Sequence, residues 1–192
     1  MITGVILAGG LSRRMGGVDK GLQLLNGKPM VQRVLERFAP QVNEVLINAN
    51  QNAAQYGALG HPVVPDQIPD FAGPLAGLHA ALSKAAHPLV ATVPCDSPFL
   101  PVDLVSRLKT ALDAHAADLA VARTFNQAQP VFCLCRREAL PHLTAFLESG
   151  GRKFDLWYAT LKVIEVAFDD EADAFGNINT CDELIRMQSL RS

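Results

Sequence analysis

The sequence lacks the features that mark a membrane-spanning, exported or nucleic-acid-binding protein. No apolar run in its 192 residues approaches the roughly 20 residues that span a bilayer. The first ten residues, MITGVILAGG, contain no basic segment of a targeting signal. The net charge of only −2 argues against binding to nucleic acid or to a membrane surface. We therefore expect a soluble cytoplasmic protein with neither nucleic acid nor a membrane as its partner.

Cysteine is also scarce, and its spacing excludes a zinc site. The four cysteines form no C-x-x-C pair and no Cys/His zinc pattern. Cys133 and Cys135 lie two residues apart in an apolar run, so we expect both to face the same side of a strand. We interpret Cys95, Cys133, Cys135 and Cys181 as buried small side chains in a reduced compartment.

Apolar residues are plentiful, at 49%, and they fall in short runs that alternate with segments of helical spacing. The runs predict strands at 2–8, 44–49, 61–65, 89–94, 119–122, 131–135 and 163–168. The helical spacing predicts helices at 29–39, 74–84, 102–115 and 137–149, the last ending at Gly150, and a final one opened by Thr180 and Glu183. Strands that are apolar throughout indicate a mostly parallel sheet covered on both faces. The length suits one domain, residues 1–192.

Residues 7–20, LAGGLSRRMGGVDK, directly follow the first apolar run. Glycine lets backbone N–H groups turn toward a bound anion, and arginine and lysine add positive charge. Cations outnumber carboxylates by four between Arg13 and Arg37, although the whole chain is mildly acidic. Because ligands bind at the carboxyl ends of parallel strands, the stretch predicts a phosphate-binding loop. It matches neither G-x-G-x-x-G, nor Walker A, nor G-x-S-x-G, and the alternative is a glycine-rich surface turn.

Two further groups of polar residues fall at the same predicted edge of the sheet. Asp96 follows the strand at 89–94, and a carboxylate beside a triphosphate needs a cation between them. Mg²⁺ is suited to this place because it binds one or two carboxylates together with phosphate oxygens and water. The alternative for Asp96 is a turn residue before Pro98. The stretch 177–180, NINT, precedes the final helix, and helix capping by Thr180 is its alternative explanation.

The stretch from Leu7 to Lys20 resembles the signature of nucleotidyltransferases built on a glycosyltransferase-A-like Rossmann sheet. Within them the chain is most similar to the MobA family, the molybdenum cofactor guanylyltransferases. The supporting stretches, in family order, are 17–22 (GVDKGL), 26–29 (NGKP), 48–50 (NAN), 73–77 (GPLAG), 94–98 (PCDSP) and 177–180 (NINT). The resemblance implies a three-layer α/β/α sandwich with a mostly parallel, mixed and twisted sheet. It also implies that the N-terminal half binds GTP and that the C-terminal half mainly faces the acceptor.

The resemblance further implies a reaction: GMP is transferred from GTP to the terminal phosphate of molybdopterin, with release of pyrophosphate and with Mg²⁺ as cofactor. The implied GTP-binding residues are Leu7, Ala8, Gly9, Gly10, Arg14, Gly17, Lys20, Asn48, Asp66 and Asp96. The implied catalytic residues are Arg14, Lys20 and Asp96. The implied metal ligands are Asp96 and Asn179, and the implied acceptor-binding residues are Arg152, Lys153, Asn177 and Asn179.

Several alternatives stay open at this point. Asp66 suits a turn, Asn48 suits a strand-end cap, and Arg152 and Lys153 suit a surface pair at a helix start, since their flanking residues depart from the family pattern. Gly10 favours GTP over CTP, because cytidylyltransferase relatives carry alanine there. Rival functions are a molybdopterin cytidylyltransferase, another small-molecule nucleotidyltransferase and a non-catalytic GTP-binding module. We expect a monomer that docks transiently with other cofactor-synthesis proteins or apo-molybdoenzymes.

The predicted chemistry needs no general base, because the attacking phosphate oxygen is already an anion at neutral pH. The five histidines are scattered along the sequence without Ser or Cys partners in a suggestive pattern. We interpret them as surface or core residues. Catalysis is then expected to be electrostatic, since two anions must approach and negative charge must leave with pyrophosphate.

Overall fold

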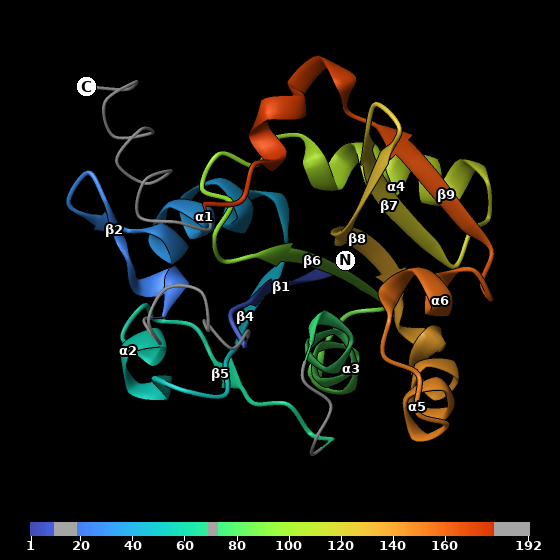
Figure 1. The fold of residues 1–192 in the computed structure, drawn as a ribbon, viewed down its shortest axis with the longest axis horizontal. Coiled ribbons are helices and arrows are strands. Elements are labelled where there is room, and N and C mark those ends of the chain that lie inside the picture. Colours follow the sequence, from blue (N-terminus) through green and yellow to red (C-terminus); the bar gives the residue numbers. More distant parts are fainter. Residues whose placement is uncertain (10–18, 69–72, 179–192) are drawn as a thin grey trace.

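The computed structural model describes residues 1–9, 19–68 and 73–178 of the chain. Its centre is a seven-stranded sheet in the order β5-β4-β1-β6-β8-β7-β9 (Figure 1). The strands are β1 (Ile2–Leu7), β4 (Glu44–Asn48), β5 (Val63–Val64), β6 (Leu89–Pro94), β7 (Leu119–Thr124), β8 (Gln127–Arg136) and β9 (Val163–Ala167). A separate small hairpin is formed by β2 (Leu24–Leu25) and β3 (Lys28–Pro29).

Parallel pairing dominates the sheet, as the apolar strands predict. Val5 in β1 pairs with Leu46 in β4 on one side and with Thr92 in β6 on the other, and both ladders are parallel. β8 is antiparallel to both of its neighbours, β6 and β7. It follows β7 through a tight turn at 125–126, and such a hairpin can join only antiparallel strands. The mixed, mostly parallel sheet implied by the resemblance is therefore confirmed.

Helices cover both faces of this sheet (Figure 1). One face packs against α1 (Met30–Phe38) and α4 (Leu104–Ala114), and the other against α3 (Pro74–Lys84), α5 (Leu140–Glu148) and α6 (Phe154–Tyr158). Val5 and Ile6 of β1 are both buried and belong to the two opposite cores, because successive side chains of a strand point to opposite faces. α2 (Ala53–Gly57) lies in the connection between β4 and β5. None of the described helices is long and apolar enough to span a bilayer.

Several boundaries differ from the sequence prediction. β8 is ten residues long rather than five, and the residues before α5 form a separate 3-10 turn, Arg137–Ala139. α2 and α6 were not predicted, because five residues are too few to show a helical period. The helix end at Gly150 is confirmed, with a φ of 92°. The predicted final helix lies outside the described residues.

The predicted burial of the cysteines is confirmed where the structure describes them. Cys133 and Cys135 are fully buried in the core beneath α3 and α5. They therefore face the same side of β8. Cys95 is also buried, all three thiols are free, and Cys181 lies outside the described residues.

A glycine in the middle of α3 sets how closely this helix approaches the sheet. A Cβ atom on Gly77 would lie 2.5 Å from Asn48 Oδ1 and 2.8 Å from Leu7 Cδ2. Both contacts are far shorter than van der Waals distance, and both neighbours stand at the ends of strands. Only glycine therefore allows α3 to pack this tightly on the carboxyl ends of β1 and β4.

We expect Gly77→Ala to destabilise the protein by about 1–3 kcal/mol, the usual cost of overpacking a well-filled interior. Gly57→Ala is the matched control, because its Cβ would meet only Val63 Cγ2 at 3.9 Å. The control is expected to stay within about 1 kcal/mol of the native chain. Urea unfolding of the three proteins measures both values, and equal stability of the two variants would contradict the packing argument.

Candidate active site

A cavity of about 250 Å³ opens where β1, β4 and β6 end. This is the edge at which open parallel sheets bind their ligands. Residues from all three strand ends reach it, together with the start of α3. Its lining residues are Leu7, Ala8, Gly9, Asp19, Lys20, Asn48, Gly73, Pro74, Pro94, Cys95, Asp96, Val131 and Asn177.

The charged centre of this cavity is the ion pair between Lys20 and Asp96. Lys20 Nζ donates to Asp96 Oδ2 at 3.3 Å, and the two side chains are 23% and 11% exposed. Asp96 stands two residues beyond the end of β6, and Lys20 begins the short 3-10 helix η2 (Lys20–Leu22). Burial raises the pKa of the Asp96 carboxyl, and the ammonium of Lys20 partly offsets that rise. The site therefore holds a desolvated carboxylate that the Lys20 ammonium compensates in part.

A second polar group stands at the end of β4. The Asn48 amide donates through Nδ2 to Val64 O at 3.1 Å and to Asp66 Oδ1 at 2.9 Å. Asn50 donates to Asp66 Oδ2 at 2.8 Å and accepts from the Asp66 backbone N–H at 2.8 Å. Both carboxylate oxygens of Asp66 thus accept amide N–H groups, which fixes the side chain of Asn48 at the wall of the cavity.

The last wall comes from the far end of the chain. The backbone N–H of Ile178 donates to Asp96 O at 3.0 Å, and Ser97 Oγ donates to Asn177 Oδ1 at 2.5 Å. Asn177 therefore lies beside Asp96, although 80 residues separate it from its partner Ser97.

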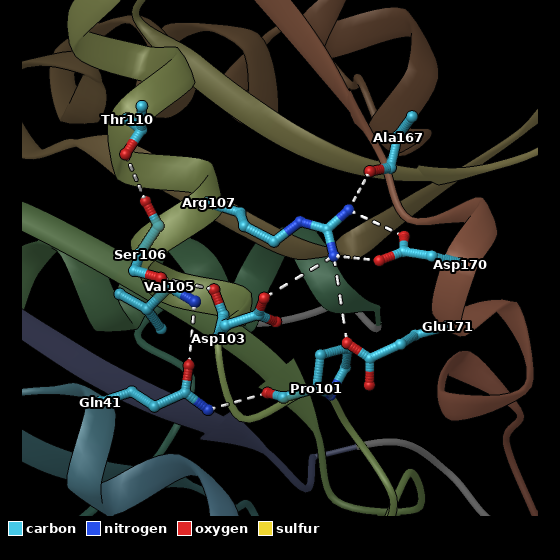
Figure 2. Close-up of polar contacts among 10 residues, drawn as sticks. All are labelled: Gln41, Pro101, Asp103, Val105, Ser106, Arg107, Thr110, Ala167, Asp170 and Glu171. Carbon is cyan, nitrogen blue, oxygen red and sulfur yellow. Dashed lines mark hydrogen bonds and ion pairs between the residues drawn. The ribbon is translucent and has the colours of Figure 1, made fainter.

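Arg107 of α4 fastens the segment that carries Asn177. Figure 2 shows its guanidinium forking onto Asp170 and donating to Ala167 O. Both N–O distances to Asp170 are 3.0 Å, and the distance to Ala167 O is 2.5 Å. The same group lies 3.8 Å from the centre of the Phe168 ring. Hydrogen bonding to Arg107 lowers the pKa of Asp170. These contacts hold the end of β9 and the following 3-10 segment, Asp169–Phe175, on α4.

The structure brings together most of the predicted site residues that it describes. Leu7, Ala8, Gly9, Lys20, Asn48, Asp96 and Asn177 line the cavity, and Asp66 adjoins it through Asn48. Arg152 and Lys153 lie on the exposed connection between α5 and α6, and neither lines the cavity. Gly10, Arg14, Gly17 and Asn179 lie outside the described residues.

Other lining residues were not singled out from the sequence. Asp19 and Pro94 stand next to residues that were, and the first glycine and proline of GPLAG supply Gly73 and Pro74. Val131 comes from antiparallel β8, which the rule about carboxyl ends of parallel strands does not cover. Its presence had no signal in the sequence.

The donor groups of the cavity fit a metal ion held jointly with phosphate. Among the described residues, no group of three or more His, Cys, Asp or Glu side chains could hold a metal alone. The described lining contains two carboxylates, those of Asp96 and Asp19. One carboxylate with substrate phosphates and water is a usual environment for Mg²⁺, whereas zinc requires three or four protein ligands.

The fold and the site together define a nucleotide-handling α/β protein with a charged cavity. None of the five histidines is among the described residues that line the cavity, so this lining offers no imidazole for proton transfer. Its ionic groups instead meet at the edge where nucleotides bind in sheets of this type.

Comparison with known proteins identifies the family. Residues 4–161 match the family described as MobA-like NTP transferase domain. The molybdenum cofactor guanylyltransferase of Cupriavidus necator is 55% identical, covering 95% of this chain and 94% of its own, and that of Ralstonia nicotianae is 52% identical, covering 99% and 97%. The chain belongs to the MobA-like NTP transferase family and is a nucleotidyltransferase.

Solved structures agree with this assignment. Molybdopterin-guanine dinucleotide biosynthesis protein A from Archaeoglobus fulgidus has a TM-score of 0.81 at 25% identity and covers 99% of this chain and 98% of its own. Rv0371C from Mycobacterium tuberculosis, solved as a manganese complex, has a TM-score of 0.69 at 20% identity and covers 98% of both chains. This second likeness concerns the fold.

Replacing Asp96 and replacing Lys20 should have opposite effects on the stability of the protein at pH 8. Because burial raises the pKa of Asp96 above its unfolded value of about 3.9, ionisation of this group opposes folding. The free energy of unfolding of the native chain should therefore fall relative to that of Asp96→Asn as pH rises from about 4 to the raised pKa. Above that pKa the difference between the two proteins should stay constant. Lys20→Met should be less stable than the native chain at pH 8, because it leaves the carboxylate without its cation. Urea unfolding at pH 4 and pH 8 tests this, and a stability difference between the native chain and Asp96→Asn that does not change between the two pH values would contradict it.

Removal of the Arg107 fork should loosen the wall that carries Asn177. In Arg107→Met, we expect the amide of Ile178 to exchange with solvent about fivefold faster, while helices away from α4 keep their protection. Lys109→Met is the control, because Lys109 pairs within α4, with Asp113 at 2.6 Å. Hydrogen exchange measured by NMR would refute this role of Arg107 if both variants behaved alike.

Proposed function

We propose that the chain transfers GMP from GTP to the terminal phosphate of molybdopterin and releases pyrophosphate. Relatives with this named activity are 50–55% identical over nearly the full chain. The observation that carries the proposal is the buried carboxylate of Asp96 opposite Lys20, in a cavity at the nucleotide-binding edge of the sheet. The homologues favour GTP as donor over the CTP alternative.

In this reaction a phosphate oxygen of molybdopterin bonds to the α-phosphorus of GTP. The bond between that phosphorus and the oxygen that bridges the α- and β-phosphates breaks, so pyrophosphate leaves. The attacking oxygen is an anion at neutral pH, so no side chain has to remove a proton. This agrees with a cavity whose described lining contains no histidine. Lys20, together with Arg14, is assigned to neutralise the charge that builds on the leaving pyrophosphate.

We propose that Asp96 holds the divalent cation of the reaction, Mg²⁺, together with phosphate oxygens, and that Asn179 is a second candidate ligand. A bound cation would supply positive charge to the phosphates. Asp96 is suited to this because its carboxylate is desolvated and the ammonium of Lys20, 3.3 Å away, offsets the cost of burial only in part. A second positive partner for Asp96 would make Lys20 available to the phosphates.

The two halves of the chain are proposed to serve the two substrates within one domain. Leu7, Ala8, Gly9, Asn48 and Asp66, with Gly10 and Gly17, are assigned to GTP, because the strands of the N-terminal half end at the cavity. The C-terminal half contributes Val131 and Asn177, which we assign to the acceptor side. Asn179, Arg152 and Lys153 stay predictions for the acceptor. We further propose a cytoplasmic monomer that docks transiently with other cofactor-synthesis proteins or apo-molybdoenzymes.

The decisive experiment measures pyrophosphate release with GTP or CTP, each with and without molybdopterin, in the presence of Mg²⁺. We expect release only with GTP and molybdopterin together. Asp96→Ala should lower turnover by about 10²-fold or more, the loss seen when one group that stabilises a transition state is removed. Lys109→Met serves as the folded control, because it changes an exposed residue of α4 that pairs within its own helix.

Each alternative gives a different result in the same assay. Release with CTP would indicate a cytidylyltransferase, release without molybdopterin would indicate a different acceptor or hydrolysis, and GTP binding without release would indicate a binding module. Near-normal turnover of Asp96→Ala would remove Asp96 from the proposed metal site.

A further inference from the structure

Three donors converge on the carboxylate of Asp19, the residue just before Lys20. Asp19 Oδ1 accepts from the phenol of Tyr56 at 2.5 Å and from the backbone N–H of Gly21 at 3.1 Å. Asp19 Oδ2 accepts from Asn52 Nδ2 at 2.9 Å. We call Asp19, Asn52 and Tyr56 the Asp19 cluster. It joins the start of η2 to α2, although more than 30 residues separate them in the chain.

Tyr56 is buried and Asn52 has a left-handed backbone conformation, and both side chains donate to Asp19. Tyr56 is fully buried in the core beneath α1, and burial, followed by nearby negative charge, raises the pKa of its phenol, so it stays a donor. Asn52 precedes α2 with a φ of 55° and makes no side-chain hydrogen bond to cap that helix. Its amide donates to Asp19 instead. The side chains of Asn52 and Tyr56 are thus directed at Asp19, and that of Asn52 does not cap α2.

The contact fixes the backbone from which Lys20 projects. Asp19 caps η2, whose first residue is Lys20. A Cβ atom on Gly21 would lie 2.6 Å from the Tyr56 hydroxyl and 3.2 Å from Cys95 Sγ. η2 is therefore seated tightly between Tyr56 and the residue that precedes Asp96. This packing of η2 sets both the direction in which the Lys20 side chain points and its distance from Asp96.

We propose that Asp19, held by Tyr56 and Asn52, is a positioning residue that places the Lys20 ammonium for its role in nucleotidyl transfer. This inference rests on the proposed function, because it assigns Lys20 to the leaving pyrophosphate. Asp19 itself acts through η2, since its two oxygens are occupied by Tyr56, Gly21 and Asn52. A charged group that is fixed before the reaction stabilises developing charge without reorganisation.

Tyr56→Phe removes only the hydroxyl and keeps the buried ring. We expect kcat to fall about 10- to 30-fold, because displacement of a catalytic group by about 1 Å costs up to 10²-fold, while KM for GTP changes less than about threefold. Asp19→Asn should have the same effect, since its amide nitrogen would face a donor of Tyr56, Gly21 or Asn52. Tyr158→Phe is the matched control, because it removes the other phenol of the chain from α6, outside the described cavity lining.

A double-mutant cycle separates positioning from general structural support. In a Lys20→Met background, Tyr56→Phe should change kcat less than about twofold, because the residue through which it acts is gone. If the two effects multiply instead, Tyr56 does not act through Lys20 and the proposal is overturned. Equal loss of activity in Tyr158→Phe would overturn it as well.

A readout that does not need the reaction keeps this inference separate from the proposed function. Acylation of lysines at fixed pH, measured by mass spectrometry, should label Lys20 at least about threefold faster in Tyr56→Phe, with Lys28 as the internal reference. Lys28 pairs with Glu36 at 2.7 Å and lies outside the described cavity lining. If the native chain fails to transfer GMP but Lys20 labelling still rises, the proposed function is wrong and the positioning stands. Unchanged labelling would overturn the positioning itself.

Discussion

The contact between Lys20 and Asp96 is the constraint on which the rest of the site depends. A carboxylate that is only 11% exposed is unfavourable unless a positive charge stands close to it. The two residues come from segments 76 positions apart, so the fold must bring the end of β6 and the start of η2 to one point. Each neighbouring element can be understood by how it keeps these two side chains facing one another.

Three contacts keep Lys20 and Asp96 close together, and each comes from a different part of the chain. Gly77 lets α3 approach the ends of β1 and β4, so that the walls of the cavity stay close together. The Asp19 cluster seats η2 from the side of α2. Arg107 forks onto Asp170 (Figure 2). This fork fastens the segment that leads to Asn177, which lies beside Asp96. The site is therefore a product of the whole sheet and its flanking helices.

The sequence predicts the parts of this arrangement that are local, and it misses those that are tertiary. Asp96 and Lys20 belong to stretches that follow apolar runs, so the place of these two residues at the carboxyl edge could be predicted from strand polarity alone. The direction of β8 could not, because an apolar run does not show whether it pairs parallel or antiparallel. The partnership of Asp19 with Tyr56 was also invisible, since it depends on α2, a five-residue helix without a readable period. Arg152 and Lys153 were predicted by family position, and the structure leaves them on an exposed connection outside the cavity lining.

The electrostatics of Lys20 and Asp96 connect the stability of the fold with the proposed chemistry of the site. Burial that raises the pKa of Asp96 makes its ionised form costly in the folded chain, and the Lys20 ammonium offsets that cost only in part. A carboxylate in that condition gains more from an added cation than a solvated one would, because its water has already been removed. In the proposed reaction, Asp96 would hold a divalent cation that brings further positive charge to the site, and Lys20 would face the phosphates of the nucleotide. Under that proposal the ion pair would be exchanged for substrate contacts, and nucleotidyl transfer would need no imidazole in the described cavity lining.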